Sequence, residues 1–130
     1  MTKRERAQKA FDKWVRVLRL AHWEIELILE DVAYVEADNV SPDCGAVGKV
    51  DRYFSALSAT ITVAGQQAAE DIEATILHEC LHIVVTELGS LAYGLANTQG
   101  EETRHAAKAH IDTAEEHVVR ILERAFDEVA

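Results

Sequence analysis

Residues 70–88 read EDIEATILHECLHIVVTEL and combine a long apolar pattern with the start and stop signals of a helix. Asp71 and Glu73 place acidic side chains in the first turn of an expected helix, and Gly89 follows the stretch as a stop signal. At about 100° per residue, the apolar side chains cover well over half of the helix circumference, which is typical of a buried helix. These side chains are Ile72, Ile76, Leu77, Cys80, Leu81, Ile83, Val84, Val85 and Leu88. We therefore expect one buried helix from Glu70 to Leu88.

The narrow polar side of this helix carries an HExxH motif at residues 78–82. His78 and His82 are four residues apart, so they lie one above the other on the same face. Two imidazoles at this spacing can bind one Zn²⁺, and Glu79 can then take a proton from a water at the metal. Burial of these groups without partners is costly, and a metal ion would remove much of that cost. The motif therefore predicts a zinc site with Glu79 as its catalytic base.

A third metal ligand is expected on a second long helix, because a catalytic zinc usually takes three protein ligands and leaves one position for water. Thr98 and Glu101 have capping-box spacing, which predicts a helix from about residue 99 to 128. Its expected inward arc consists of Ile111, Ala114, Val118, Val119, Leu122, Ala125, Phe126 and Val129. Glu115 projects into the middle of this arc, where a carboxylate needs a cation or hydrogen-bond partners. Glu115 is therefore the expected third ligand.

Other residues remain candidates for that position, because the phase of a long predicted helix drifts by a residue. Glu116 points about 100° away from Glu115 and falls near Glu123, at the edge of the arc. The remaining alternatives are an Asp, Cys44, or one of His105, His110 and His117, whose outer positions are more typical of solvated side chains.

The rest of the chain predicts three strands and one further helix in a single α+β domain spanning residues 1–130. Residues 4–21 are expected to be helical. Residues 23–30 and 57–63 alternate apolar and polar side chains with the period of a half-buried strand, and a third strand is expected over residues 46–53. Residues 31–45 and the glycine-containing segment 89–100 are expected to be irregular.

The net charge and the cysteine content indicate which kinds of partner and which cellular location to expect. The formal net charge is −10, with seven basic residues against Glu5 and Asp12 in residues 1–20. An acidic body argues against nucleic acid and anionic membrane as partners, and the basic segment reads as the solvated face of the first helix. A membrane-surface or partner-docking role for that helix is the alternative. No apolar run approaches a membrane span, no secretory pattern is present, and two cysteines imply no disulfide framework. We expect a cytoplasmic, reducing location.

The motif and its flanks resemble the minimal gluzincins, compact zinc metallopeptidases with HExxH on one helix and a Glu ligand on the next. The chain looks closest to the small HExxH proteins of phages, prophages and other mobile elements. The resemblance rests on the alternating strands before the motif, on residues 78–82, and on Glu115 followed by apolar Val118, Val119 and Leu122. The third His and the Gly that metzincins carry soon after this motif are absent.

The resemblance implies a zincin-like fold and hydrolysis of peptide bonds in a protein or peptide substrate. It also implies a strand beside the cleft that pairs with an extended peptide, and the strand of Ser58, Thr60 and Thr62 is the candidate. Tyr93 and Tyr53 are candidates for stabilising the oxyanion. Two other classes stay open: a metal-binding or interaction module without peptidase activity, and a structural helical protein without metal.

Overall fold

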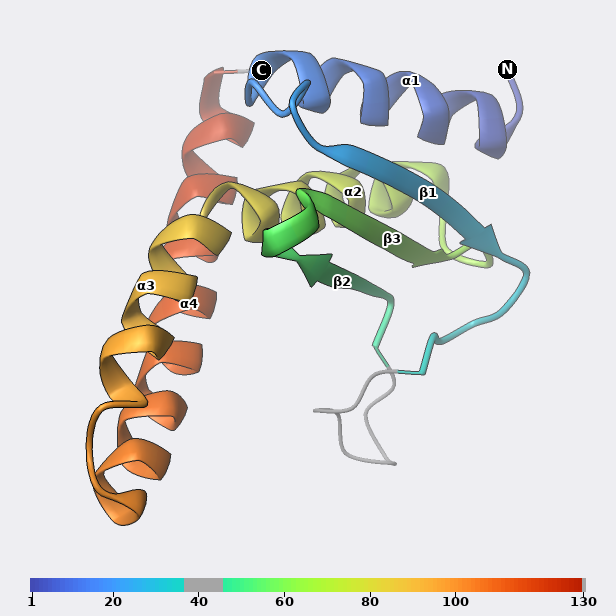
Figure 1. The fold of residues 1–130 in the computed structure, drawn as a ribbon. Helices are drawn as coiled ribbons and strands as arrows, with labels where there is room; N and C mark the ends of the chain where they lie inside the picture. The colour runs from blue at the N-terminus through green and yellow to red at the C-terminus, as the bar shows by residue number, and fades with distance from the viewer. Residues whose placement is uncertain (37–45, 130) are drawn as a thin grey trace.

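The structure, a computed structural model, describes residues 1–36 and 46–129. These residues form an α+β fold with four α-helices and a small three-stranded mixed sheet (Figure 1), which confirms the expected fold class. The elements are α1 (Lys3–Val17), β1 (Glu24–Glu30), β2 (Gly48–Tyr53), the 3₁₀ turn η1 (Phe54–Ala56), β3 (Ser58–Ala64), α2 (Ala69–Val84), α3 (Thr86–Ala96) and α4 (Glu101–Val129).

The sheet has the strand order β1-β3-β2, with β3 parallel to β1 and antiparallel to β2. Ile61 of β3 lies opposite Leu27 on one side and Val50 on the other. All three strands were expected, and their ends differ from expectation by one or two residues. The expectation that β3 pairs with a peptide is wrong, because β3 is the central strand and both its edges are already occupied. β2 is the edge strand on that side of the sheet.

Helix α2 is the centre of the core, as its wide apolar arc predicts. Ile72, Ile76, Cys80 and Leu81 are fully buried, and Ile83 is 1% exposed. Helix α2 packs against α1, α4 and the two strands β2 and β3. Among the described residues, no helix combines the length and the apolar character needed to cross a membrane.

The end of α2 differs from the expected single helix to Leu88. Helix α2 ends at Val84, and a separate helix, α3, occupies Thr86–Ala96, where an irregular segment was expected. Figure 1 shows α3 and α4 side by side, extending beyond the sheet. Gly89 and Gly94 suggested a loop, but the cost of about 1 kcal/mol for each glycine in a helix is outweighed here by packing on α4. Leu88 is consequently 71% exposed rather than buried.

Helix α1 covers α2 and contacts the C-terminal part of α4. Its side chains Ala7, Ala10 and Trp14 are buried, and the Trp14 ring meets Phe126 edge-on at a centroid distance of 5.5 Å. A capping box between Thr2 and Glu5 starts the helix. The helix ends at Val17, earlier than the expected Ala21. The amphipathic arrangement is as predicted, with most basic side chains exposed, whereas Arg6 is half-buried and pairs with Glu70 and Glu73 of α2.

Candidate metal centre

The two histidines of the motif lie on successive turns of α2, with their Nε2 atoms directed toward the same point. His78 Nε2 and His82 Nε2 are 3.3 Å apart. Both side chains are partly buried, because α4 passes over this side of α2. Two imidazole nitrogens therefore converge on one position, as the i, i+4 spacing predicts.

Glu116 of α4 faces both imidazoles. Its Oε1 lies 3.2 Å from His78 Nε2, and its Oε2 lies 3.1 Å from His82 Nε2. His78, His82 and Glu116 each offer one ligand atom, and these atoms all lie within 4.8 Å of one another. Such a group could hold a metal ion, and it contains the carboxylate that the sequence suggested only as an alternative.

Glu115, the expected third ligand, lies beside this group but is bound by Arg52. Arg52 Nη1 is 2.5 Å from Glu115 Oε1, and Arg52 Nη2 is 3.3 Å from Glu115 Oε2, so the two side chains form a bidentate ion pair. Glu115 is not a member of the group that could hold a metal. Glu116, and not Glu115, therefore completes the group that could hold a metal, and the carboxylate of Glu115 has a cationic partner from the edge strand β2 instead.

The Nδ1 atoms of both histidines are turned toward carboxylates. His78 Nδ1 lies 2.8 Å from Glu123 Oε2, which is hydrogen-bond distance. His82 Nδ1 lies 3.6 Å from Glu115 Oε2, an electrostatic contact rather than a hydrogen bond of normal length. Ligating histidines almost always donate this second ring N–H to a carboxylate, a carbonyl or water, which fixes the ring and the tautomer. Glu123 and Glu115 are placed for this orienting role.

Glu79, the expected catalytic base, lies between α2 and β2 and is only 7% exposed. A Cβ atom built on Gly48 would lie 3.4 Å from Glu79 Oε1, so the carboxylate occupies the space beside the missing side chain of Gly48 in β2. Burial raises the pKa of Glu79 above its ordinary value of 4.5, and the positive charge of His82 and His78 opposes this only in part. A carboxylate with a raised pKa is a better proton acceptor near neutral pH.

The neighbouring charges shift the pKa values of Glu115 and His82 in opposite directions. Burial alone would raise the pKa of Glu115, but the contacts with His82 and Arg52 outweigh it and hold the pKa at about 2. Burial alone would lower the pKa of His82, but Glu115, Glu79 and Glu116 raise it above 6.5. Glu115 is thus a permanent carboxylate at neutral pH, and its charge is shared between Arg52 and His82.

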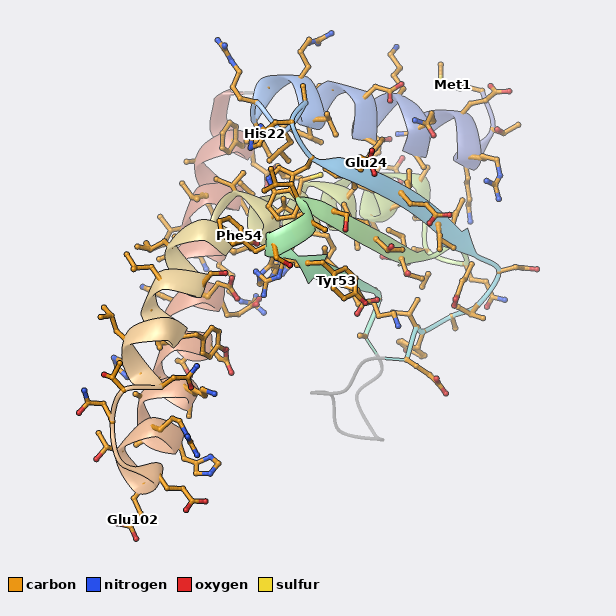
Figure 2. All side chains as sticks on the ribbon, in the orientation of Figure 1. Met1, His22, Glu24, Tyr53, Phe54 and Glu102 are labelled. Carbon is orange, nitrogen blue, oxygen red and sulfur yellow. The ribbon has the colours of Figure 1, made fainter. Side chains whose placement is uncertain are left out.

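The other residues considered from the sequence do not join the group. His105, His110 and His117 are exposed. The Tyr93 hydroxyl donates a hydrogen bond to the Asp112 carboxylate. Tyr53 is 61% exposed at the end of β2, next to η1 (Figure 2). The thiol of Cys80 points into the core, where burial raises its pKa to about 12. Cys44 lies outside the described residues.

The sequence reasoning missed the roles of Arg52 and Glu123. Glu123 follows Glu116 by seven residues, so the two share one face of α4, and this spacing was a usable signal. Arg52 had no comparable signal, because its partners lie 30 to 63 residues away in the chain.

No protein-family model, curated protein or solved structure matches this chain.

Proposed function

We propose that this chain is a zincin-like, zinc-dependent peptidase in which His78, His82 and Glu116 hold Zn²⁺ and Glu79 is the general base. One observation carries the proposal. Both imidazoles present Nε2 to the Glu116 carboxylate, while each Nδ1 is turned to another carboxylate. This arrangement is typical of ligating histidines, which present one ring nitrogen to the metal and donate the other N–H to a carboxylate, a carbonyl or water. A cytoplasmic location belongs to the same proposal, because the Cys80 thiol is free and buried.

The donor set fits zinc better than the other common divalent cations. Two imidazole nitrogens and one carboxylate oxygen are the His₂Glu set of catalytic zinc sites, which keep a fourth position open. Mg²⁺ and Ca²⁺ prefer oxygen ligands, so a site with two histidines does not suit them. The chemistry that Zn²⁺ supplies in such a site is the polarisation of a carbonyl and the acidification of water.

The chain's own residues provide the proton transfer. Glu79 would accept a proton from the attacking water and pass it to the leaving amine, as a general base and then a general acid. Its burial between α2 and β2 excludes bulk water and raises its pKa toward the operating range. Arg52 is engaged by Glu115, His82 and Thr86, so it is placed to hold the site together.

Among the described residues, β2 pairs with β3 on one side and has no partner strand on the other, and we propose this outer edge as the place where an extended substrate adds. The Ala64 N–H donates to the Val47 carbonyl, so the backbone of Val47 faces β3. Along an antiparallel pair this orientation alternates, and the backbone groups of Gly48, Val50 and Arg52 therefore face away from β3. A peptide that added to this edge would pass Gly48, the residue of β2 whose missing side chain leaves room for Glu79. In our proposal β2 replaces β3 as the strand that pairs with substrate.

A second candidate function is metal binding without hydrolysis. The 7% exposure of Glu79 favours it, because a carboxylate so covered has little room for water and a scissile bond together. The two functions differ in one property: only the peptidase requires Glu79 for turnover, whereas both require the metal ligands.

The testing experiment measures metal first and hydrolysis second. Elemental mass spectrometry of the purified protein should give a zinc-to-protein ratio near one, and a quenched fluorescent peptide library should be cleaved. The Glu116→Gln variant should lose the zinc. Glu102→Gln, a matched change at the exposed far end of α4 (Figure 2), should keep it. A ratio near zero that persists after zinc is added back would exclude both candidate functions. A zinc-replete protein that cleaves no peptide would favour the second.

A further inference from the structure

We propose that Arg52 is a positioning residue that holds Glu115 beside His82 and so leaves Glu116 as the carboxylate that binds the metal. This inference rests on the metal site proposed above and adds the device that chooses between two adjacent carboxylates. Glu115 and Glu116 are separated by about 100° on α4. Both approach His82: Glu115 is 3.6 Å from Nδ1, and Glu116 is 3.1 Å from Nε2.

Arg52 joins three elements at this point. Its guanidinium extends from β2 to the Glu115 carboxylate on α4 through both Nη atoms. Nη1 also donates to the His82 carbonyl oxygen at 2.9 Å and lies 3.2 Å from the Thr86 hydroxyl oxygen. The Thr86 hydroxyl in turn donates to the same His82 carbonyl at 2.9 Å and is buried. One guanidinium therefore fixes the backbone at the second histidine and the carboxylate next to its ring.

The pairing is specific to arginine and to this face of the strand. The planar fork of a guanidinium matches both oxygens of a carboxylate, which a lysine ammonium cannot do. Both side chains are mostly buried, with exposures of 26% for Arg52 and 15% for Glu115. Lys49 lies three residues earlier on the same strand, so its side chain points to the opposite face, and its nearest carboxylate, Asp51, is 3.9 Å away. Lys49 is thus a matched basic residue without contact to the site.

Removal of the guanidinium would free Glu115. Its carboxylate would lose its bidentate partner, and it already lies 3.6 Å from Nδ1 of the His82 ring whose Nε2 faces the proposed metal position. The second carboxylate could then enter the metal's coordination sphere, and the orientation of His82 would no longer be fixed. Loss of an orienting partner of a ligating histidine typically costs 10- to 100-fold in metal affinity.

The experiment uses Arg52→Met with Lys49→Met as the control, in the full chain. Zn²⁺ affinity is measured by competition with a chromogenic chelator, and the visible spectrum of the Co²⁺-substituted protein reports the coordination sphere. We expect about a 10- to 100-fold weaker Zn²⁺ affinity for Arg52→Met, together with a changed Co²⁺ spectrum. Lys49→Met should bind Zn²⁺ within about twofold of the unaltered protein. In the double variant Arg52→Met/Glu115→Gln, the original Co²⁺ spectrum should return, because an amide is a poor ligand.

A purely structural role for Arg52 would lower stability without changing the Co²⁺ spectrum, and that result would overturn the inference. Arg52→Lys keeps the charge and serves if Arg52→Met does not fold; it should show the same spectral change in weaker form. A Glu115→Gln variant that loses more affinity than Glu116→Gln would also overturn it, because Glu115 would then be the ligand. If the unaltered protein binds no Zn²⁺, the proposed function itself fails. If it binds and Arg52→Met matches it in affinity and spectrum, only the role of Arg52 is refuted.

Discussion

Substitution of Gly48 by alanine should destabilise the protein through a single methyl contact. A Cβ atom at Gly48 would lie 2.3 Å from Thr75 Cγ2, where carbon atoms normally keep about 3.5–4.0 Å. Thr75 cannot turn away freely, because it is β-branched and buried, and its hydroxyl donates to the Asp71 carbonyl at 2.8 Å. The side chain or the strand must therefore move.

The loss of stability caused by the overlap of the added methyl group with Thr75 can be judged from the packing around Gly48. Extra methyl groups in a well-packed core typically cost about 1–3 kcal/mol, and this site combines an immobile neighbour on α2 with a strand held in register by β3. We expect Gly48→Ala to lower the free energy of unfolding by about 2 kcal/mol. Removal of the opposing methyl by Thr75→Ser should restore much of that loss. The coupling between the two changes should therefore be at least about 1 kcal/mol.

Urea unfolding of the metal-free protein, followed by circular dichroism, measures all four members of this double-mutant cycle. Gly94→Ala is the control, because nothing lies within 4 Å of a Cβ at Gly94 on the exposed side of α3. That variant should be stabilised by up to about 1 kcal/mol through helix propensity. The reasoning is refuted if Gly48→Ala unfolds within about 0.5 kcal/mol of the unaltered protein, or if its loss is independent of Thr75.

Three further outcomes are expected from the site. Glu79→Gln should retain zinc and lose peptide hydrolysis; undiminished turnover in a cleavage assay would remove Glu79 from the mechanism. Zinc should raise the melting temperature of the unaltered protein but not of His78→Ala, and equal shifts in calorimetry would place the metal elsewhere. The pKa of Glu115 is depressed from 4.5 to about 2, so its stabilisation is present above pH 4.5 and is lost as the pH falls toward 2. The metal-free Glu115→Gln variant should not lose this stability at low pH, where the loss for the unaltered protein is at most about 3 kcal/mol. If the free energy of unfolding of the variant falls at low pH as it does in the unaltered protein, the ion pair is contradicted.

The buried helix α2 and the strands could be predicted because their apolar patterns identify the element even when its ends or its phase are wrong by one residue. The apolar arc of α2 covers so much of the helix that a phase error of one residue still leaves its side chains in the core. The break between Val84 and Thr86 could not be predicted, since neither glycine nor proline marks it. It depends instead on the packing of α3 against α4, where Ala96 is buried and Gly89 faces Glu115.

The expected inward arc of α4 was too wide, because it counted exposed apolar side chains as inward, although Glu115 is 15% exposed, in keeping with its expected inward position. Val118 is 43% exposed, and Ala114 and Ala125 are also exposed, whereas Val119 is fully buried. With Val119 at the centre of the buried side, Glu116 and Glu123 turn toward α2, where both meet His78. The positions of the apolar residues in the sequence do not show which side of α4 faces α2, because apolar residues also occur on protein surfaces.

The choice between Glu115 and Glu116 is finally a question of which carboxylate lacks a buried cation. Glu115 has Arg52, a pair that is largely shielded from water. In the described structure the basic partner of Glu116, apart from the two histidines, is Arg120, which is 63% exposed and one helical turn away. Such surface pairs contribute about 0.3–0.5 kcal/mol to stability, which is too little to offset the cost of partly burying the Glu116 carboxylate against two imidazoles. A divalent cation between Glu116, His78 and His82 would supply the missing charge, and at Glu115 the same cation would compete with a guanidinium already in place.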